Sequence, residues 1–403
     1  MDHRPHEPAG QGLHGLVNRP HTTMRAHHPS RTAVLLLRAT LACTVAALLV
    51  SGVVGGLLRA GVAVPLPGHS AWPGQAVLAH AFLMVCAFMG TLIGVERAVA
   101  LKHRFAFAAP GASALAGVLV LAGMATAAAW LGVLAAVVFI AVNVIVVSRQ
   151  RAAHTLLLLA AAVAWLVGNL LHAWTAQPAA VIPWWFSFLV LTIAAERLEM
   201  TRLMRRRSGA GLLLAVCLAA LLLSSVLSAL SPAHGGLLYG LGLTGLAAWL
   251  FSFDIARRTV FAHGLSRYMA LCLLLGYGWL AIAGAAWMAA AVGHATRDAA
   301  LHALGLGFVF SMMLGHAPVI LPALARVKLL FGWFFYVPLG LLHISLAVRL
   351  FFGPFDARLL AAGAAGNAAA IAVFAATMIG AAVAWRVRHP PSTEKRHAVP
   401  APP

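Results

Sequence analysis

Five histidines lie inside strongly apolar stretches of this 403-residue chain, namely His80, His172, His302, His316 and His343. An ionisable group near the centre of a membrane helix costs about 2.5–3.5 kcal/mol on insertion scales, so each one is a functional hypothesis by default. Neutral imidazole is also the commonest metal ligand in proteins. The histidines therefore indicate a bound metal or a metal-containing cofactor, if the helices that carry them bring several together.

Carboxylates are nearly absent from the same stretches. Glu96, Glu196 and Asp254 lie at the ends of apolar segments, each close in sequence to an arginine. A proton-coupled pump would usually place an acid near the middle of the membrane. The chemistry available inside this chain is therefore that of imidazole.

The composition is that of a polytopic all-α membrane protein. Hydrophobic residues make up 62% of the chain and charged residues only 9%, whereas soluble domains carry roughly 25% charged residues. The net charge of +19 comes from short basic clusters between apolar blocks. Membrane topology explains such clusters without a nucleic-acid partner, so the expected partner is the lipid bilayer.

Twelve apolar runs approach the roughly 20 residues that a membrane-spanning helix needs. We expect one transmembrane domain over residues 33–388, between a disordered, basic, His-rich tail (1–32) and a second disordered tail (389–403). The predicted helices cover residues 34–57, 76–97, 108–128, 130–148, 155–175, 179–197, 210–230, 235–255, 268–292, 299–322, 329–351 and 358–385.

Lysine and arginine gather in alternate loops, which the positive-inside rule assigns to the cytoplasm. The opposite loops hold little beyond Arg59, Arg297 and Arg358. This asymmetry predicts an even number of helices with both termini cytoplasmic, in the inner membrane of a bacterium. The cytoplasmic set comprises both tails and the loops with Arg97, Lys102 and Arg104; Arg149 and Arg151; Arg202, Arg205, Arg206 and Arg207; Arg257, Arg258 and Arg267; and Arg326 and Lys328.

With this orientation, four of the histidines fall in the outer half of the bilayer. His80 and His302 lie about one turn below the outer surface, in the second and tenth segments. His172 lies near the outer end of the fifth segment, and His343 lies about two turns deep in the eleventh. We expect His80 and His302 to be the best pair of metal or cofactor ligands, followed by His343 and then His172.

His316 belongs to the same segment as His302 but lies 14 residues further on, about 20 Å deeper. It is a further candidate metal ligand, or part of a polar path from the cytoplasm. The alternative is a histidine hydrogen-bonded to a helix bent by Pro318 and Pro322. For any one histidine taken alone, a hydrogen-bonded core residue is the commoner outcome.

Two short motifs recur along the chain. Residues 80–83 (His-Ala-Phe-Leu) resemble residues 302–305 (His-Ala-Leu-Gly), and residues 94–97 (Gly-Val-Glu-Arg) resemble residues 194–197 (Ala-Ala-Glu-Arg). The echoes are consistent with three pseudo-repeated four-helix units.

Cysteines and tryptophans have simpler interpretations. We expect the four cysteines to be buried and free, as small hydrophobic side chains. We expect Trp72, Trp174, Trp184, Trp185 and Trp287 to form an aromatic belt at the membrane interface.

About twelve spans, residues 80–84 (His-Ala-Phe-Leu-Met) and residues 302–304 (His-Ala-Leu) make the chain similar to NnrS-type haem–copper membrane proteins. More distantly, it resembles the catalytic subunit of haem–copper oxidases and nitric oxide reductases. In the oxidases, histidines of the second and tenth helices hold a low-spin haem, and the resemblance implies that role for His80 and His302. It also implies copper as a second cofactor, nitric oxide as a gaseous ligand, and a redox partner.

The chain departs from these families at several positions. Phe82 and Leu83 stand where NnrS-type proteins have the second His and the Glu of His-Ala-His-Glu-Met. Residues 315–318 (Gly-His-Ala-Pro) match their Gly-His-Thr-Gly element only in part, and the copper ligands of the oxidases have no counterpart. The resemblance therefore implies a haem more strongly than a copper centre.

Three functions remain in competition. The first is a haem-binding inner-membrane protein linked to nitric oxide response, detoxification or electron transfer, with Arg297 and Arg349 near the haem propionates. The second is a transporter that passes protons or metal ions by way of histidines and a helix broken between Gly315 and Pro322. The third is an assembly or scaffold protein. The sequence does not decide whether the protein is an enzyme.

Overall fold

The computed structural model describes residues 31–65, 71–175, 177–200, 208–325 and 327–390. The tails expected at 1–32 and 389–403 lie almost wholly outside these residues, as do Arg202, Arg205, Arg206, Arg207 and Arg326. The chain divides into two units, Met1–Cys43 and Thr44–Pro403. The described part of the first unit is the beginning of helix α1 (Arg31–Arg59). The site described below belongs to the second unit.

The chain is a polytopic α-helical membrane protein, as the composition predicts. The described residues contain no strand, and twelve of their helical segments are long and apolar enough to cross a membrane. The spans are Ala39–Arg59, His80–Leu101, Arg104–Leu121, Ala125–Arg149, Ala153–Trp174, Pro178–Met200, Ala210–Leu230, Pro232–Phe253, Gly264–Ala291, Arg297–Pro322, Trp333–Phe352 and Ala357–Arg388.

Most spans are single α-helices, and four of them are composite. The single helices after α1 are α6 (Ala125–Arg149), α7 (Ala153–Trp174), α8 (Pro178–Met200), α9 (Ala210–Leu230), α10 (Pro232–Phe253), α12 (Gly264–Ala291) and α16 (Ala357–Arg388). The composite spans are the second (α3 His80–Phe82, η1 Leu83–Met89, α4 Gly90–Leu101), the third (η2 Arg104–Phe107, α5 Ala108–Leu121), the tenth (α13 Arg297–His302, η3 Ala303–Phe310, α14 Ser311–Ala325) and the eleventh (η4 Trp333–Phe335, α15 Tyr336–Ala347, η5 Val348–Phe352). Two short helices, α2 (Trp72–Leu78) and α11 (Ala256–Thr259), lie between spans.

The predicted boundaries agree closely with the structure, with one clear error. The third helix was predicted to continue to residue 128, but α5 ends at Leu121. Gly123 follows with a φ of 81°, a left-handed conformation that suits glycine and turns the chain into α6. The apolar run continues through this turn, so hydropathy alone could not locate it.

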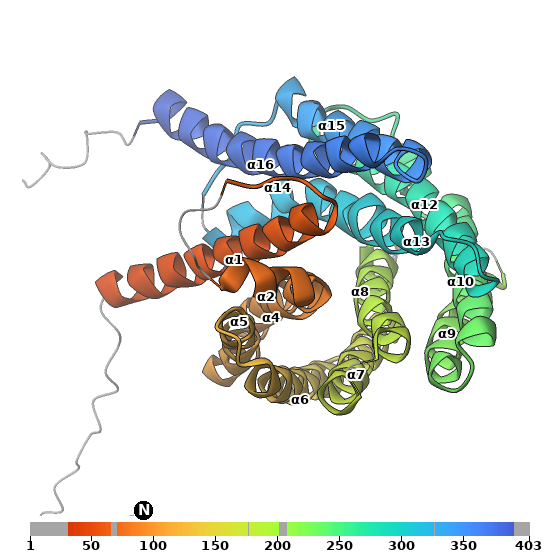
Figure 1. Cartoon of the computed structure of the whole chain (residues 1–403). Helices are drawn as coiled ribbons and strands as arrows, with labels where there is room; N and C mark the ends of the chain where they lie inside the picture. Colours follow the sequence, from red (N-terminus) through yellow and green to blue (C-terminus); the bar gives the residue numbers. More distant parts are fainter. Residues whose placement is uncertain (1–30, 66–70, 176, 201–207, 326, 391–403) are drawn as a thin grey trace, which may run out of the picture. The chain divides into compact units, whose positions relative to one another are not determined.

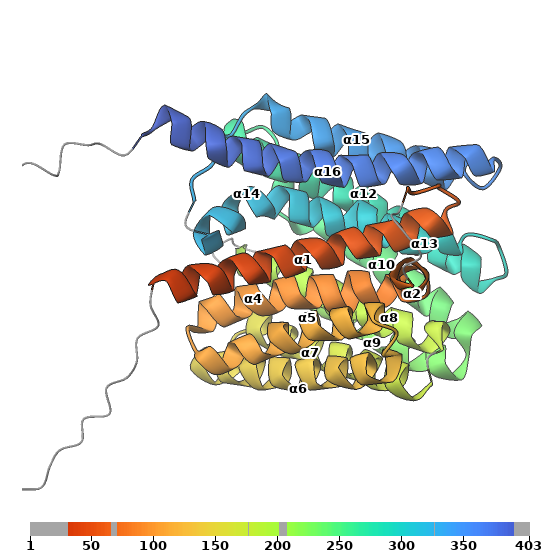
Figure 2. The same ribbon diagram turned by 60° about the vertical axis from the view of Figure 1, so that its left-hand side comes forward.

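Consecutive helices pack side by side through much of the second unit. Both ribbon views show α5, α6 and α7 as neighbours, and α15 beside α16 (Figures 1 and 2). Helix α8 is the most enclosed of the spans, with 83% of its most apolar stretch buried, against 67% or less for the others. It contacts both η1 of the second span and η3 of the tenth. The sixth span therefore lies between the two segments that carry His80 and His302.

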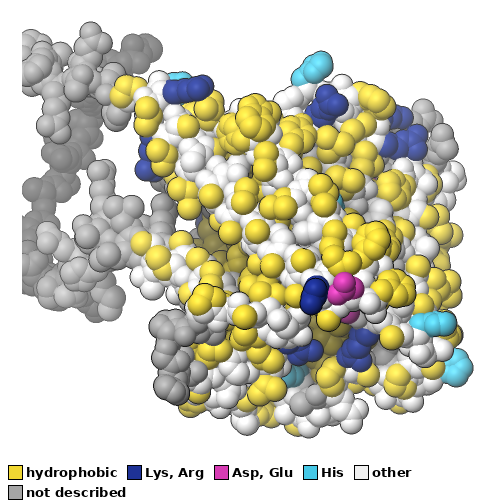
Figure 3. All heavy atoms as spheres, turned by 45° about the horizontal axis from the view of Figure 1, so that its top comes forward, with side chains coloured by type: hydrophobic (Ala, Val, Ile, Leu, Met, Phe, Trp, Pro, Cys, Tyr) yellow, Lys and Arg dark blue, Asp and Glu magenta, His cyan; other side chains and the backbone are white. Residues whose placement is uncertain are grey.

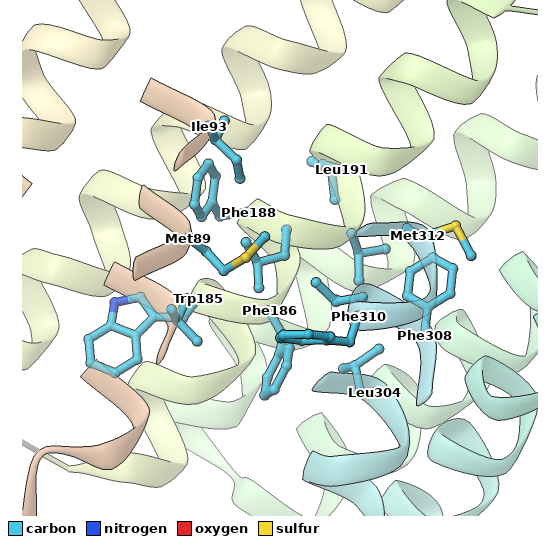
Figure 4. Close-up of a cluster of buried hydrophobic side chains, with 14 of the residues drawn as sticks. Met89, Ile93, Trp185, Phe186, Phe188, Leu191, Leu304, Phe308, Phe310 and Met312 are labelled. Carbon is cyan, nitrogen blue, oxygen red and sulfur yellow. The ribbon is translucent and has the colours of Figure 1, made fainter. Parts of the chain in front are cut away.

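The core between these three spans is aromatic and aliphatic. Figure 4 shows Met89 of the second span, Phe186 of α8 and Phe310 of the tenth span within one buried cluster. All three side chains are less than 10% exposed. Trp185 of α8 is only 2% exposed, so it belongs to this core and not to the interfacial belt that we expected.

The sides of the helices that face away from the core carry exposed apolar side chains, as a lipid-facing surface requires. Leu156, Leu223 and Ile379 are each more than half exposed although they lie within spans. The face in Figure 3 is covered largely by hydrophobic side chains, with few charged groups among them. Cys86, Cys217 and Cys272 are buried and free as predicted, whereas Cys43 is exposed.

Three π-helical segments occur in the described part of the chain: η1, η3 and η5. A π-helix adds a residue to a helical turn and is frequent at functional sites. The first two begin within three residues after His80 and His302, and the third contains Arg349. All three therefore border the region that the sequence singled out.

Candidate cofactor site

The structure brings His80 and His302 together. Their imidazole rings lie with centroids 6.3 Å apart and planes inclined by only 25°. His80 opens α3 directly after the interruption at Ala79, and His302 is the last residue of α13. The similar motifs at residues 80–83 and 302–305 thus occupy equivalent places, each beside the start of a π-helix.

Both rings carry a hydrogen-bond partner at Nδ1 that can only accept. His80 Nδ1 lies 2.8 Å from the carbonyl oxygen of Gly52. His302 Nδ1 lies 3.0 Å from the carbonyl oxygen of Asp298 and 2.9 Å from its carboxylate Oδ1. Since a neutral imidazole has one N–H, Nδ1 donates in both rings and Nε2 keeps its lone pair. This is the tautomer in which histidine binds a metal through Nε2.

The spacing of the rings suits one metal ion between them. A metal–imidazole bond is about 2.0 Å long, and each nitrogen lies about 1.1 Å from the centre of its own ring. Two axial imidazoles aimed at one metal from opposite sides would therefore have centroids about 6 Å apart. The observed 6.3 Å agrees with that separation, and it also lies within the range of offset-stacked rings.

A cavity opens beside both histidines. Its volume is about 140 Å³. The walls come from the first, second, sixth, tenth, eleventh and twelfth spans, and Met89, Phe186 and Phe310 from the core in Figure 4 are among them. Apart from the two histidines, the most polar lining residues are Arg349 and Asn367. The cavity is thus a largely apolar space that both His80 and His302 line.

Asp298 belongs to this site although the sequence analysis did not select it. Besides its contact with His302, its carboxylate accepts two hydrogen bonds from Arg349, at 2.8 Å and 3.1 Å. Arg349 is thus engaged with a protein carboxylate, whereas we expected it near haem propionates. The signal in the sequence was the four-residue spacing of Asp298 and His302, which places them on one face of a helix.

His343 adopts the opposite tautomer. Trp279 Nε1 can only donate, and it lies 2.7 Å from His343 Nδ1. The lone pair of His343 is therefore used at Nδ1, and Nε2 carries the hydrogen. Nε2 is buried and has no hydrogen-bond partner among the described residues. His343, which we predicted as the next ligand after His80 and His302, therefore presents an N–H donor at Nε2 and no lone pair there.

His172 lies in an aromatic cluster and not at the cavity. Its ring packs 5.3 Å from Phe82 and 5.1 Å from Trp185, measured between centroids. Trp185 in turn donates a hydrogen bond to Asn169, 3.0 Å away. The structure therefore separates His172 from the pair, in spite of its similar expected depth.

His316 lies near a group of charged side chains at the other end of the tenth span. Glu96, Arg197 and Asp254 are close enough to act on it electrostatically. Its Nδ1 lies 2.7 Å from the carbonyl oxygen of Met312, and its Nε2 is buried without a described partner. Helix α14 continues through Pro318 and Pro322 to Ala325, so the break expected there does not occur.

The charged group near His316 is built from ion pairs between spans. Arg197 donates two 2.8 Å hydrogen bonds to Asp254, with both side chains almost fully buried. Arg97 lies 2.9 Å from Glu196 and 3.8 Å from Glu96. The two Glu-Arg motifs of the second and sixth spans therefore meet in space, and this group is called the ion-pair cluster below.

The His80–His302 pair could hold a group that takes only two ligand atoms from the protein. Within the described ranges, no group of three or more His, Cys, Asp or Glu is placed to hold a metal ion. A haem brings four equatorial nitrogens of its own and needs only axial protein ligands. Two parallel imidazoles with free Nε2 lone pairs beside an apolar cavity supply that set.

The comparisons with known proteins assign a family. The family described as "Domain of unknown function (DUF8744)" matches residues 37–383. The chain belongs to this family. The DUF8744 region includes both histidines of the pair, Asp298, Arg349 and all residues of the ion-pair cluster. No curated protein and no solved structure matches the chain.

Proposed function

We propose that the protein is a membrane haem protein in which His80 and His302 are the two axial ligands of one haem. The observation that carries the proposal is the pair of near-parallel rings 6.3 Å apart, each with Nδ1 bound to an acceptor. A haem bound in this way supplies one-electron chemistry. Because His80 and His302 would both hold the haem, we assign the protein to electron transfer.

The residues around the pair would each contribute to holding the group. Apolar walls such as Met84, Leu306 and Ile371 would exclude water from the macrocycle. Gly56 leaves room beside His80, since a Cβ at this position would lie 2.8 Å from Cε1 of the ring. Asp298 and Gly52 would hold the rings in the ligating tautomer.

The proposed location rests on the charge pattern. The positive-inside rule favours cytoplasmic termini and supports a position of the His80–His302 pair in the outer half of a bacterial inner membrane. A haem there would exchange electrons with a redox partner at the outer face. A copper ion is not part of the proposal, because the pair alone supplies only two ligands.

The test is the haem content of the purified protein. The full chain, produced in haem-replete cells and solubilised in detergent, should show a Soret band and about one haem per chain in a pyridine haemochrome assay. His80→Ala and His302→Ala should each change the band or abolish it. His343→Ala and His172→Ala are matched controls, since their rings lie elsewhere. A colourless wild-type protein would refute the proposal.

A further inference from the structure

A second cavity lies among the ends of α8, α9, α10, α12 and α13, next to the cavity that the two histidines line. Its volume is about 370 Å³, and small-molecule sites in proteins typically measure about 300–1,000 Å³. Its deepest walls are buried, as at Ser228 and Ala300, whereas its rim is exposed, as at His294 and Arg297. The cavity therefore opens where the helices end and narrows towards the core.

The rim of this cavity carries a guanidinium and an imidazole, from Arg297 and His294. We expected Arg297 near haem propionates, but it lines this second cavity and not the one beside the histidines. It takes part in no ion pair within the part of the chain that the structure describes. The carboxylate of its neighbour Asp298 is engaged by Arg349 and His302. The Arg297 guanidinium is therefore available to an anion from outside the protein.

Two prolines in the cavity wall remove hydrogen-bond donors from carbonyl oxygens in the same wall. In an α-helix, a carbonyl accepts from the N–H four residues further on, and proline has no N–H. Pro183, inside α8, therefore cannot donate to the Ala179 carbonyl oxygen. Pro232, just beyond the end of α9, cannot donate to that of Ser228. All four residues line the cavity, so a ligand that reaches these oxygens must bring donors of its own.

The two sets of groups select one class of ligand. A guanidinium binds phosphate oxygens with its planar fork of N–H groups, and the His294 ring adds a further N–H donor. The carbonyl oxygens call for O–H or N–H groups on the same ligand. A second positive charge would be repelled by Arg297, which favours hydroxyl groups over an ammonium group. Ile182 and Leu301 give the inner wall an apolar surface.

We propose that the second cavity binds a phosphate ester of a hydroxyl-rich alcohol such as glycerol. The phosphate lies against Arg297 and His294, and the hydroxyl groups donate to the carbonyl oxygens of Ala179 and Ser228. An anionic phospholipid headgroup and a soluble glycerol phosphate share this chemistry. The mouth lies at the ends of membrane spans, at the depth where lipid headgroups are found. The site is distinct from the His80–His302 pair and does not depend on a haem.

The test uses the full chain in detergent, freed of its native lipid, with bound molecules counted by native mass spectrometry. Three probes are titrated: short-chain phosphatidylglycerol, phosphatidylcholine of the same chain length, and glycerol phosphate. Phosphatidylcholine has the phosphate but no hydroxyl donor and carries a second positive charge. We expect one phosphatidylglycerol per chain to bind at least about tenfold more tightly than phosphatidylcholine, since charged hydrogen bonds are worth about 1.5–3 kcal/mol each. Glycerol phosphate that binds as tightly as the lipid would identify the soluble ester as the ligand.

Arg297→Met should weaken the binding of phosphatidylglycerol at least about tenfold, and Arg297→Lys should keep part of the affinity. Arg358→Met is the matched control, because Arg358 is also exposed at the beginning of a span and does not line the cavity. Ala233→Trp places an indole on the exposed rim and should also block binding. Each variant should unfold at the temperature of the wild type when no ligand is present, which excludes a folding defect.

The outcomes separate this site from the proposed haem site. Equal affinity for the three probes, or equal affinity in wild type and Arg297→Met, would overturn the second site. Binding that is lost in Arg358→Met as much as in Arg297→Met would show general attraction to positive charge and would overturn it too. Arg297→Met should contain as much haem as the wild type, and a wild-type chain without haem would refute the proposed function and leave the phosphate-ester site standing.

Discussion

The chain buries polar side chains in two regions that lie towards opposite ends of the tenth span, and the two regions use them differently. In the ion-pair cluster, charged side chains pair with one another, as Arg197 does with both carboxylate oxygens of Asp254. At the His80–His302 pair, the hydrogen-bond partners all lie on the Nδ1 side, and the Nε2 lone pairs remain available beside a cavity. The ion pairs join one span to another, whereas the two histidines line a cavity.

The ion-pair cluster is not completely satisfied, which makes the contrast testable. Arg97 Nε, and His316 Nε2 beside the cluster, are buried without a described hydrogen-bond partner. Neither of these residues lines the cavity beside the histidines. Isolated orphan atoms of this kind are commonly served by single buried waters.

The largest effect should come from breaking the ion-pair cluster. Arg197→Met leaves Asp254 buried without its guanidinium partner, and loss of one member of a buried ion pair costs about 3–5 kcal/mol. We expect the free energy of unfolding, measured in detergent, to fall by that amount. Arg257→Met is the control, since Arg257 is exposed and donates a hydrogen bond to the Ser252 carbonyl oxygen. Its effect should stay within about 0.5 kcal/mol.

The haem content of folded Arg197→Met protein tests whether the ion-pair cluster and the His80–His302 pair act independently. Because the ion-pair cluster and the pair are separate, each remaining folded molecule should bind one haem. A folded variant that has lost its haem would show that the two regions act as one unit.

A smaller effect is expected at the His80–His302 pair, where the change should lower haem affinity and leave the stability nearly unchanged. Gly56→Ala places a Cβ 2.8 Å from Cε1 of His80 and pushes the ring out of position. We expect haem binding to weaken at least about tenfold, equivalent to about 1.4 kcal/mol, with little change in stability. Gly340→Ala is the matched control, because a Cβ there meets nothing within 4 Å. Equal haem affinity in both variants would argue against His80 as a ligand.

The smallest effect should come from Trp279→Phe. This change removes the donor to His343 Nδ1 and should cost about 1 kcal/mol of stability. The visible spectrum should not change if His343 is no ligand. A shifted Soret band in this variant would indicate that His343 is a ligand of the haem.

The spans could be predicted closely from hydropathy because each covers the same membrane thickness. The helix at 210–230 was predicted to the residue, and the third failed only where an apolar turn around Gly123 left no polar signal. The meeting of His80 and His302 followed from similar expected depths and a shared motif. Their neighbours at that depth, His172 and His343, did not join them, because depth does not specify which way a side chain points around its helix.

Asp298 and the ion pairs show that contacts between distant residues could not be predicted from the sequence. Asp298 lies near the end of its span, where a charged residue draws little notice, and its role depends on Arg349, 51 residues away. Glu196 pairs with Arg97 and not with the adjacent Arg197. Long-range partners of this kind follow from helix packing, which no local pattern encodes.

The π-helical segment η1 lies between His80 and the Glu96–Arg97 motif on one span. A π-helix accommodates an extra residue within an otherwise α-helical rod. Each residue turns an α-helix by about 100°, so deleting one residue within Leu83–Met89 would rotate one end of the span against the other. The side chains of either the histidine or the Glu-Arg pair would then point to the wrong neighbour. The extra residue thus sets the rotation between the two ends of the span, so that one helix can present His80 and the Glu-Arg motif to two separately placed partners.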